Sequence, residues 1–131
     1  MSENVGIVRA AYDALSRGDI DAALKNVARD AEYDTSRALG PVHGIYRGHD
    51  EIRKSWEEFS EPWESQRWEA TEFIEHGDYV VTPMTNSLRG RDGIEVQARV
   101  AFLWTIRDGT VTRLCFYQGR QDALEAAGLS E

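Results

Sequence analysis

The sequence predicts an α+β domain in which helices pack on one face of a curved antiparallel sheet. Apolar residues recur at three- and four-residue spacing up to residue 62, and from residue 67 onward they alternate. The alternating segments are separated by short turns that contain glycine, as antiparallel strands are. Because 131 residues is the length of one domain, we expect a single unit over residues 1–131, with helices first and the sheet after them.

Three amphipathic segments predict helices in the first half of the chain. Residues 3–17 have helical spacing, and Gly18 follows where a left-handed cap would end the helix. A second helix is expected over residues 20–29, capped by the aspartate before it. A third is expected over residues 50–61, because Pro62 cannot continue it.

Strands are expected on both sides of the third helix. A short strand over residues 31–37 precedes it, followed by a glycine- and proline-containing loop over residues 39–48. Pro83 cannot donate a ladder hydrogen bond, so we place it at a bulge or where its strand runs unpaired. A brief helix over residues 121–127 ends the chain. The four strands of the predicted meander are Trp68–Ile74, Tyr79–Arg89, Ile94–Ile106 and Thr110–Gln118.

Alternation along these strands separates an inner face from an outer face. Packed against the helices, the inner face would form a pocket lined by Met84, Val100, Phe102, Leu114 and Phe116 from the sheet and by Trp56 and Phe59 from the third helix. The outer face would still carry Ala101, Leu103, Val111, Cys115 and Tyr117, which is too apolar for contact with water. We therefore expect a homodimer through the outer face.

Composition limits the partners of the chain. The formal net charge is −8 and no basic run stands against it, so we expect no nucleic-acid partner. One cysteine, Cys115, allows no internal disulfide and fits a reducing cytoplasm. We expect no membrane partner, since neither a signal-type segment nor a run of about 20 apolar residues is present.

Five segments of the chain resemble the SnoaL-like branch of the NTF2-like superfamily, in its order and spacing. They are AYDALSRGDIDAAL (11–24), RDAEYD (29–34), GIYRGHDEIRKSWEEF (44–59), VAFLWTIRDGTVTRL (100–114) and FYQGRQDALEAAGL (116–129). The resemblance implies an NTF2-like cone, a curved antiparallel sheet packed against three helices around an internal pocket, and frequent dimers. It implies no single reaction, because this fold hosts isomerases, cyclases, dehydratases, hydrolases and plain ligand binders.

The catalytic positions of the best-known relatives are not retained. Ketosteroid isomerases depend on carboxyl groups of tuned pKa, and the resemblance places their three catalytic positions on Ala11, Thr35 and Phe102. The last carboxylate of the epoxide hydrolase relay falls on Phe116. The two positions used by polyketide cyclases fall on Phe102 and Gly119. If the chain is an enzyme, its acid and base therefore lie elsewhere.

Asp34 and His43 are the candidate catalytic residues, since they titrate usefully near the predicted pocket. Desolvation beside an apolar pocket would raise the pKa of Asp34 and make it a general base. The alternatives are that Asp34 points outward with Thr35 inward, and that His43 is an ordinary solvated loop residue. Possible hydrogen-bonding residues toward a ligand are Thr35, Tyr46, Asn86 and Gln118, although Tyr46 can equally be a wall residue.

Two functions are favoured by the sequence, ahead of a protein-interaction adaptor, which is weaker because the outer face is expected to serve self-association. One is a cofactor-independent acid/base enzyme of isomerase, cyclase, dehydratase or hydrolase type that acts on an oxygenated hydrophobic small molecule. The other is a small-molecule-binding or accessory protein without catalysis. We expect no cofactor, because no phosphate-binding glycine loop is present, and no metal, because the histidines lack ligand spacing with acidic neighbours.

Overall fold

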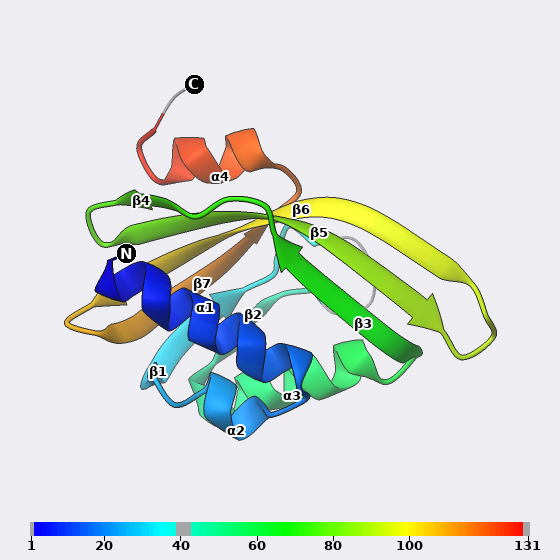
Figure 1. Ribbon diagram of the computed structural model, residues 1–131. Coiled ribbons are helices and arrows are strands. Elements are labelled where there is room, and N and C mark those ends of the chain that lie inside the picture. Colours follow the sequence, from blue (N-terminus) through cyan, green and yellow to red (C-terminus); the bar gives the residue numbers. More distant parts are fainter. Residues whose placement is uncertain (1, 39–42, 130–131) are drawn as a thin grey trace.

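A computed structural model describes residues 2–38 and 43–129 of the chain. Its helices are α1 (Glu3–Ser16), α2 (Ile20–Ala23), α3 (Gly48–Ser60) and α4 (Arg120–Ala126). Its strands are β1 (Val27–Asp34), β2 (Ile45–Arg47), β3 (Trp63–Ala70), β4 (Ile74–His76), β5 (Tyr79–Gly90), β6 (Glu95–Arg107) and β7 (Thr110–Tyr117). Figure 1 shows α1, α2 and α3 beneath the curved sheet and α4 above it. The α+β class is confirmed, and a fourth helix lies on the face opposite the other three.

The sheet has the order β2-β1-β7-β6-β5-β3, with β4 also paired to β5. All these pairs are antiparallel except β1 with β7, which is parallel. The expectation of a wholly antiparallel sheet is therefore wrong at this pair. The parallel pair arises because the chain leaves β1, forms β2 and α3, and builds β3 to β6 before β7 returns beside β1.

The helix starts and ends follow the capping signals in the sequence. Ser2 Oγ accepts a hydrogen bond from the Val5 amide at 3.1 Å, and Asp19 Oδ1 accepts one from the Ala22 amide at the same distance. Gly18 follows α1 with φ +72°, a conformation that glycine adopts without strain. As expected, α3 ends before Pro62.

The second helix is shorter than its apolar pattern predicts. It ends at Ala23, and β1 begins at Val27 instead of residue 31. Pairing with β7 decides this boundary, because the Val111 amide donates to the Asn26 carbonyl at 2.8 Å and Val27 is in register with Val111. Tertiary pairing therefore overrides local helix propensity here.

Two further boundaries differ from the expectation. Residues 45–47 of the expected loop form β2 on the edge of β1, while residues 39–42 of that loop lie outside the described residues. β3 begins at Trp63, directly after α3, and not at residue 68. Pro83 stands where pairing of β5 passes from β3 to β4, so the sheet accommodates its missing N–H as expected.

The inner face of the sheet is the one expected. Met84, Val100, Phe102 and Trp104 are buried in one core cluster with α1, and Leu114 and Phe116 pack against it. Val111 belongs to this inner cluster as well, although the sequence placed it outside. A register shift between Thr105 and Ile106 in the pairing of β6 with β7 breaks the simple alternation that the prediction assumed.

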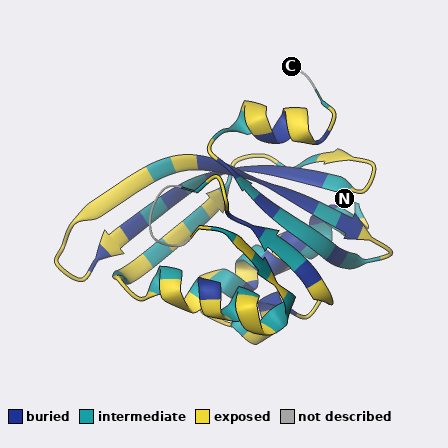
Figure 2. Cartoon of the chain, turned by 180° about the vertical axis from the view of Figure 1, so that it is seen from behind, coloured by how far each residue is buried: buried dark blue, intermediate teal, exposed yellow. Residues whose placement is uncertain are grey.

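The apolar residues of the outer face are covered within the chain itself. Ala123, Leu124 and Ala127 of α4 form a second core cluster with Val81, Ala101, Leu103, Cys115 and Tyr117. Figure 2 shows the central strands buried and the end of the β5–β6 hairpin exposed. The premise of an exposed apolar outer face is therefore wrong, because α4 occupies it. The homodimer remains a prediction, but an exposed apolar outer face no longer supports it.

Candidate ligand-binding cavity

An internal cavity of about 90 Å³ lies between the three helices and the inner face of the sheet. Its walls come from α1, α2, α3, β1, β3, β6 and β7 and are almost entirely apolar. Six aromatic side chains contribute to them: Tyr12, Tyr33, Trp56, Trp68, Phe102 and Trp104. Small-molecule sites usually have this composition, with many apolar groups and a few placed polar ones.

The aromatic residues form a continuous packed row from α3 to β7. Ring centroids are 6.1 Å apart for Trp56 and Trp68, 5.9 Å for Trp68 and Phe102, and 5.4 Å for Phe102 and Phe116. Phe59 lies 5.9 Å from Trp56 and 5.8 Å from Trp68. Aromatic pairs in such stacked, tilted and edge-to-face arrangements add about 0.5–1.5 kcal/mol each to the burial of their area, so this wall is a stable part of the core.

A polar triad interrupts the apolar wall. The hydroxyl groups of Tyr12 and Thr82 are hydrogen-bonded at 2.7 Å, and Trp104 Nε1 donates to both, at 3.1 Å to Tyr12 Oη and 3.3 Å to Thr82 Oγ1. The three groups carry three protons, and the contact between the hydroxyls uses only one hydroxyl proton. One hydroxyl proton therefore has no acceptor within the triad.

Either hydroxyl can be the donor of this contact, and we infer that the surplus proton is on Tyr12. Thr82 is fully buried on β5, whereas Tyr12 lines the cavity. If Thr82 donates to Tyr12, then Tyr12 can donate into the cavity, and both hydroxyl protons can take part in hydrogen bonds. Burial raises the pKa of Tyr12 well above its ordinary value, despite its hydrogen bonds to Thr82 and Trp104. The phenol is thus a neutral donor at physiological pH.

Tyr33 is a second phenol on the cavity wall. It lies on β1 with Ala31, which lines the cavity on the same face. Burial raises the pKa of Tyr33, and the neighbouring Tyr12 and Tyr46 raise it further. Tyr33 therefore offers a second neutral donor, held in place by Tyr46 at a ring distance of 6.4 Å.

Of the residues expected to bind ligand, the structure brings three directly to the cavity: Trp56, Phe102 and Leu114. Phe59 and Phe116 support them through the aromatic row, and Met84 and Val100 lie in the adjoining core. Asn86 is buried on β5 in register with Trp68, and no hydrogen bond to its side chain is found among the described residues.

The other residues expected to form hydrogen bonds with a ligand make contacts outside the cavity. Thr35 Oγ1 donates to the Gly44 carbonyl at 3.1 Å, and Gln118 Nε2 donates to the Arg37 carbonyl at 2.6 Å. Tyr46 packs against Tyr33 at a ring distance of 6.4 Å and does not line the cavity. These contacts involve Arg37 and Gly44 on either side of residues 39–42, and β2.

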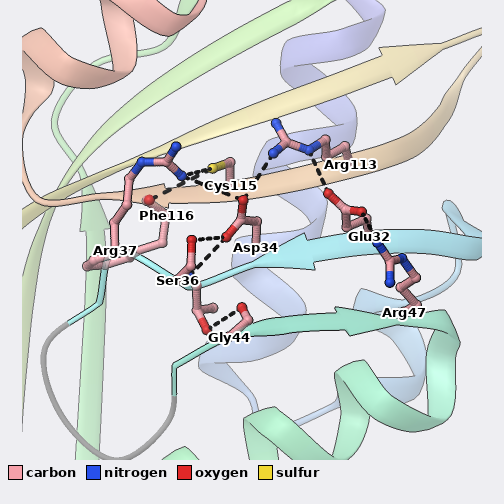
Figure 3. A network of polar contacts seen from close by, with 10 residues as sticks. Glu32, Asp34, Ser36, Arg37, Gly44, Arg47, Arg113, Cys115 and Phe116 are labelled. Atoms are coloured by element: carbon pink, nitrogen blue, oxygen red, sulfur yellow. Dashed lines mark hydrogen bonds and ion pairs between the residues drawn. The ribbon is translucent and has the colours of Figure 1, made fainter.

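Asp34 lies on the outer face of β1, within a network of charged groups (Figure 3). Its Oδ1 accepts hydrogen bonds from the Ser36 hydroxyl at 2.6 Å and the Ser36 amide at 2.9 Å. Its Oδ2 lies 3.1 Å from Arg113 and 3.5 Å from Arg37. Burial alone would raise the pKa of Asp34, but Ser36 and the two guanidinium groups outweigh it and hold the pKa below the ordinary value.

These contacts correct the expectation for Asp34. Its side chain does not line the cavity, and its pKa is lowered instead of raised. The alternation that placed Thr35 and Asp34 on opposite faces gave the right orientation. His43 is exposed in the loop before β2 and does not line the cavity either.

Sequence reasoning missed both tyrosines of the cavity. Tyr12 lies in the helical apolar spacing of residues 3–17, and Tyr33 lies in a strand whose pairing partner the sequence does not show. A signal was present, since a buried tyrosine needs a partner for its hydroxyl. In the described part of the chain, no group of three or more potential metal ligands occurs, and no helix is long and apolar enough to cross a membrane.

Comparison with known proteins identifies the family. Residues 8–114 match the SnoaL-like domain, and the chain belongs to this family. The solved structure of TerC co-crystallised with polyporic acid superposes with a TM-score of 0.83 at 26% identity, over 97% of this chain and 99% of that one. No protein with a curated description matches the chain.

Two further structures share the fold at lower identity. An NTF2-like protein from Burkholderia pseudomallei has a TM-score of 0.82 and 22% identity, over 95% of this chain and 97% of that one. A ketosteroid isomerase-like protein from Catenulispora acidiphila, in complex with trimethylamine, has a TM-score of 0.75 and 18% identity, over 94% and 92%. The NTF2-like fold expected from the sequence is thus confirmed.

Proposed function

We propose that this SnoaL-like domain binds a hydrophobic small molecule with an oxygen acceptor, such as a ketone, in the aromatic cavity. The apolar part of the ligand would contact Trp56, Trp68 and Phe102, and its oxygen would accept hydrogen bonds from Tyr12 and Tyr33. No cofactor is part of this proposal. TerC, which was co-crystallised with polyporic acid, supports small-molecule binding in this fold.

The observation that carries the proposal is the surplus proton of the Tyr12 triad. A buried donor without an acceptor costs about 1–3 kcal/mol, so a carbonyl oxygen that accepts from Tyr12 recovers this free energy. Trp104 and Thr82 both donate to Tyr12 Oη in this arrangement, which polarises its O–H bond toward the ligand. The same geometry discriminates against a ligand of equal shape that lacks the oxygen.

The test compares acetophenone with ethylbenzene, which has the same size but no carbonyl. Binding to the wild-type chain, Tyr12→Phe and Tyr46→Phe would be measured by NMR titration. We expect Tyr12→Phe to weaken acetophenone binding about tenfold and to leave ethylbenzene unchanged, since one net hydrogen bond is lost. Tyr46→Phe is the matched control and should change neither affinity. Equal effects of Tyr12→Phe on both ligands would refute the proposed hydrogen bond.

A cofactor-independent acid/base enzyme of isomerase, cyclase, dehydratase or hydrolase type is the second candidate. Tyr12 favours it, because a neutral donor in a dry pocket stabilises negative charge that develops on a carbonyl oxygen. Against it, the cavity lining offers no unengaged carboxylate or imidazole within residues 2–38 and 43–129: the Glu32 carboxylate is held by Arg113 and Arg47. Turnover of a ketone, epoxide or polyketide-like ester by the wild-type chain, lost in Tyr12→Phe, would favour the enzyme.

A further inference from the structure

A surface groove of about 550 Å³ adjoins the cavity. It lies where the C-terminal ends of α1 and α3 meet the beginning of β3, at one end of the molecule (Figure 1). Four side chains line both the groove and the cavity: Leu15, Ile20, Trp56 and Trp68. Because these side chains line both spaces, we infer that a ligand reaches the cavity through the groove, which we call the entrance.

The entrance has an acidic rim. Glu57, Glu61 and Glu64 line it, and its lining contains no lysine or arginine in the described part of the chain. Glu64 is partly compensated by Arg89 at 3.8 Å, but both side chains are more than half exposed, so this pair screens little. No ion pair is found for the Glu57 and Glu61 carboxylates among residues 2–38 and 43–129.

Two helix ends add negative potential at the same place. The last turns of α1 and α3 lie in the entrance lining through Ser16, Glu57 and Ser60, and neither turn contains a basic residue. The C-terminal end of a helix carries a partial negative charge and favours a cation. Arg17 follows α1 and Arg91 donates to the Glu61 carbonyl at 3.2 Å, but neither guanidinium lines the entrance.

The entrance also contains groups that suit an organic cation. Trp63 joins Trp56 and Trp68 in its lining, and indole faces attract ammonium groups. The Ser60 hydroxyl oxygen is buried there without a hydrogen-bond partner among the described residues. Aromatic side chains and carboxylates together form a recognition surface for an amine.

We propose that the entrance selects ligands by charge, and that the hydrophobic ligand of this domain carries an amine or is neutral, but is not an anion. This inference rests on the proposed small-molecule function. The apolar part would enter the cavity, while an ammonium group would stay between Glu57 and Glu61. The net charge of −8 acts in the same direction at long range.

The experiment uses three ligands that share one phenyl ring and one linker. They are 2-phenylethylammonium, 2-phenylethanol and phenylacetate, titrated by NMR at low ionic strength. We expect the cation to bind about fivefold more tightly than the alcohol, and phenylacetate to bind about fivefold more weakly than the alcohol. This is the size of the Coulomb interaction between the charged head group and two carboxylates some 7 Å away in water. High salt should reduce the differences between the three affinities, because it screens solvent-exposed charges.

A pair of double variants separates the rim from the overall charge. Glu57→Gln with Glu61→Gln should bring the three affinities within about twofold of one another. Glu75→Gln with Glu125→Gln changes the net charge equally, on exposed sites of β4 and α4, and should preserve the order. An order that survives in the rim variant, or vanishes equally in both variants, would overturn the charge selection.

The outcome for the alcohol keeps the two proposals apart. If 2-phenylethanol binds in the cavity but charge has no effect, the charge selection fails and the proposed function stands. If none of the three ligands binds but acetophenone does, the charge selection fails and the proposed function stands. If acetophenone does not bind either, both proposals fail.

Discussion

At the scale of the single residue, the environment of a group decides its chemistry more than its type does. Asp34 was the expected base because it is a carboxylate near an apolar pocket. It lies on the other face of β1, where Ser36, Arg37 and Arg113 stabilise its charged form. Tyr12 and Tyr33 are weaker acids by nature, but they line the cavity and therefore become the polar groups that a ligand would meet.

The pH dependence of stability tests the role of Asp34. Its pKa is lower in the folded chain, so its contribution is fully present above the ordinary carboxyl pKa and is lost as pH falls through the folded value. We expect Asp34→Asn to lower the free energy of unfolding by about 1–3 kcal/mol at pH 7, and by progressively less as pH falls below the ordinary carboxyl pKa.

Urea denaturation at a series of pH values measures this difference. Asp30→Asn is the control, since Asp30 is exposed on the same strand and should change stability by less than about 0.5 kcal/mol. A difference between wild type and Asp34→Asn that is the same at all pH values would contradict the charged network.

At the scale of the element, α4 changes the character of the molecule most. It has only seven residues, yet Ala123 and Leu124 are almost fully buried against the outer face of β5, β6 and β7. Without it, Leu103, Cys115 and Tyr117 would be in contact with water. The helix itself was expected from the sequence, but its position was not, because seven residues carry too little periodicity to show which surface they cover.

Leu124→Ala tests how strongly this helix is held. We expect a loss of about 2–4 kcal/mol in the free energy of unfolding, since the leucine fills a well-packed site. The Cys115 thiol, fully buried in the native chain, should react with a thiol reagent faster in this variant, because α4 opens more often. Unchanged thiol reactivity together with unchanged stability would show that α4 does not seal the outer face.

The ends of helices and strands were predicted correctly where residues close in the sequence determine them. Caps at Ser2 and Asp19, the glycine after α1 and Pro62 after α3 all act locally, and they placed these helix ends correctly. The start of β1 and the edge strand β2 depend on partners distant in the sequence, and there the prediction was wrong.

At the scale of the whole molecule, the fold and the apolar side of the site were predictable, but its polar side was not. Alternation placed Phe102 and Leu114 at the cavity, since burial on one face of a sheet is a property of pattern. Hydrogen-bonding roles depend on which side chain lies opposite another across the core. The contact of Tyr12 with Thr82 joins residues 70 positions apart, and no local pattern shows it.

The cavity, the adjoining groove and the covered outer face together support the proposed small-molecule function. The helices on one face enclose the ligand space, and α4 on the other face removes the apolar surface that suggested self-association. Sedimentation at micromolar concentration would test the homodimer, with a mass near 15 kDa excluding it at that concentration. The central claim is that a ligand binds beside Tyr12.

The most direct test of that claim follows the four tryptophan indole N–H signals during an NMR titration with acetophenone. Trp104 Nε1–H is bonded to the Tyr12 hydroxyl, so its signal should shift and saturate as the ligand occupies the cavity. In Tyr12→Phe the Trp104 shift should be lost or greatly reduced. If the Trp104 signal stays fixed while only Trp63 responds, the ligand stops at the entrance, and the account of the cavity is contradicted.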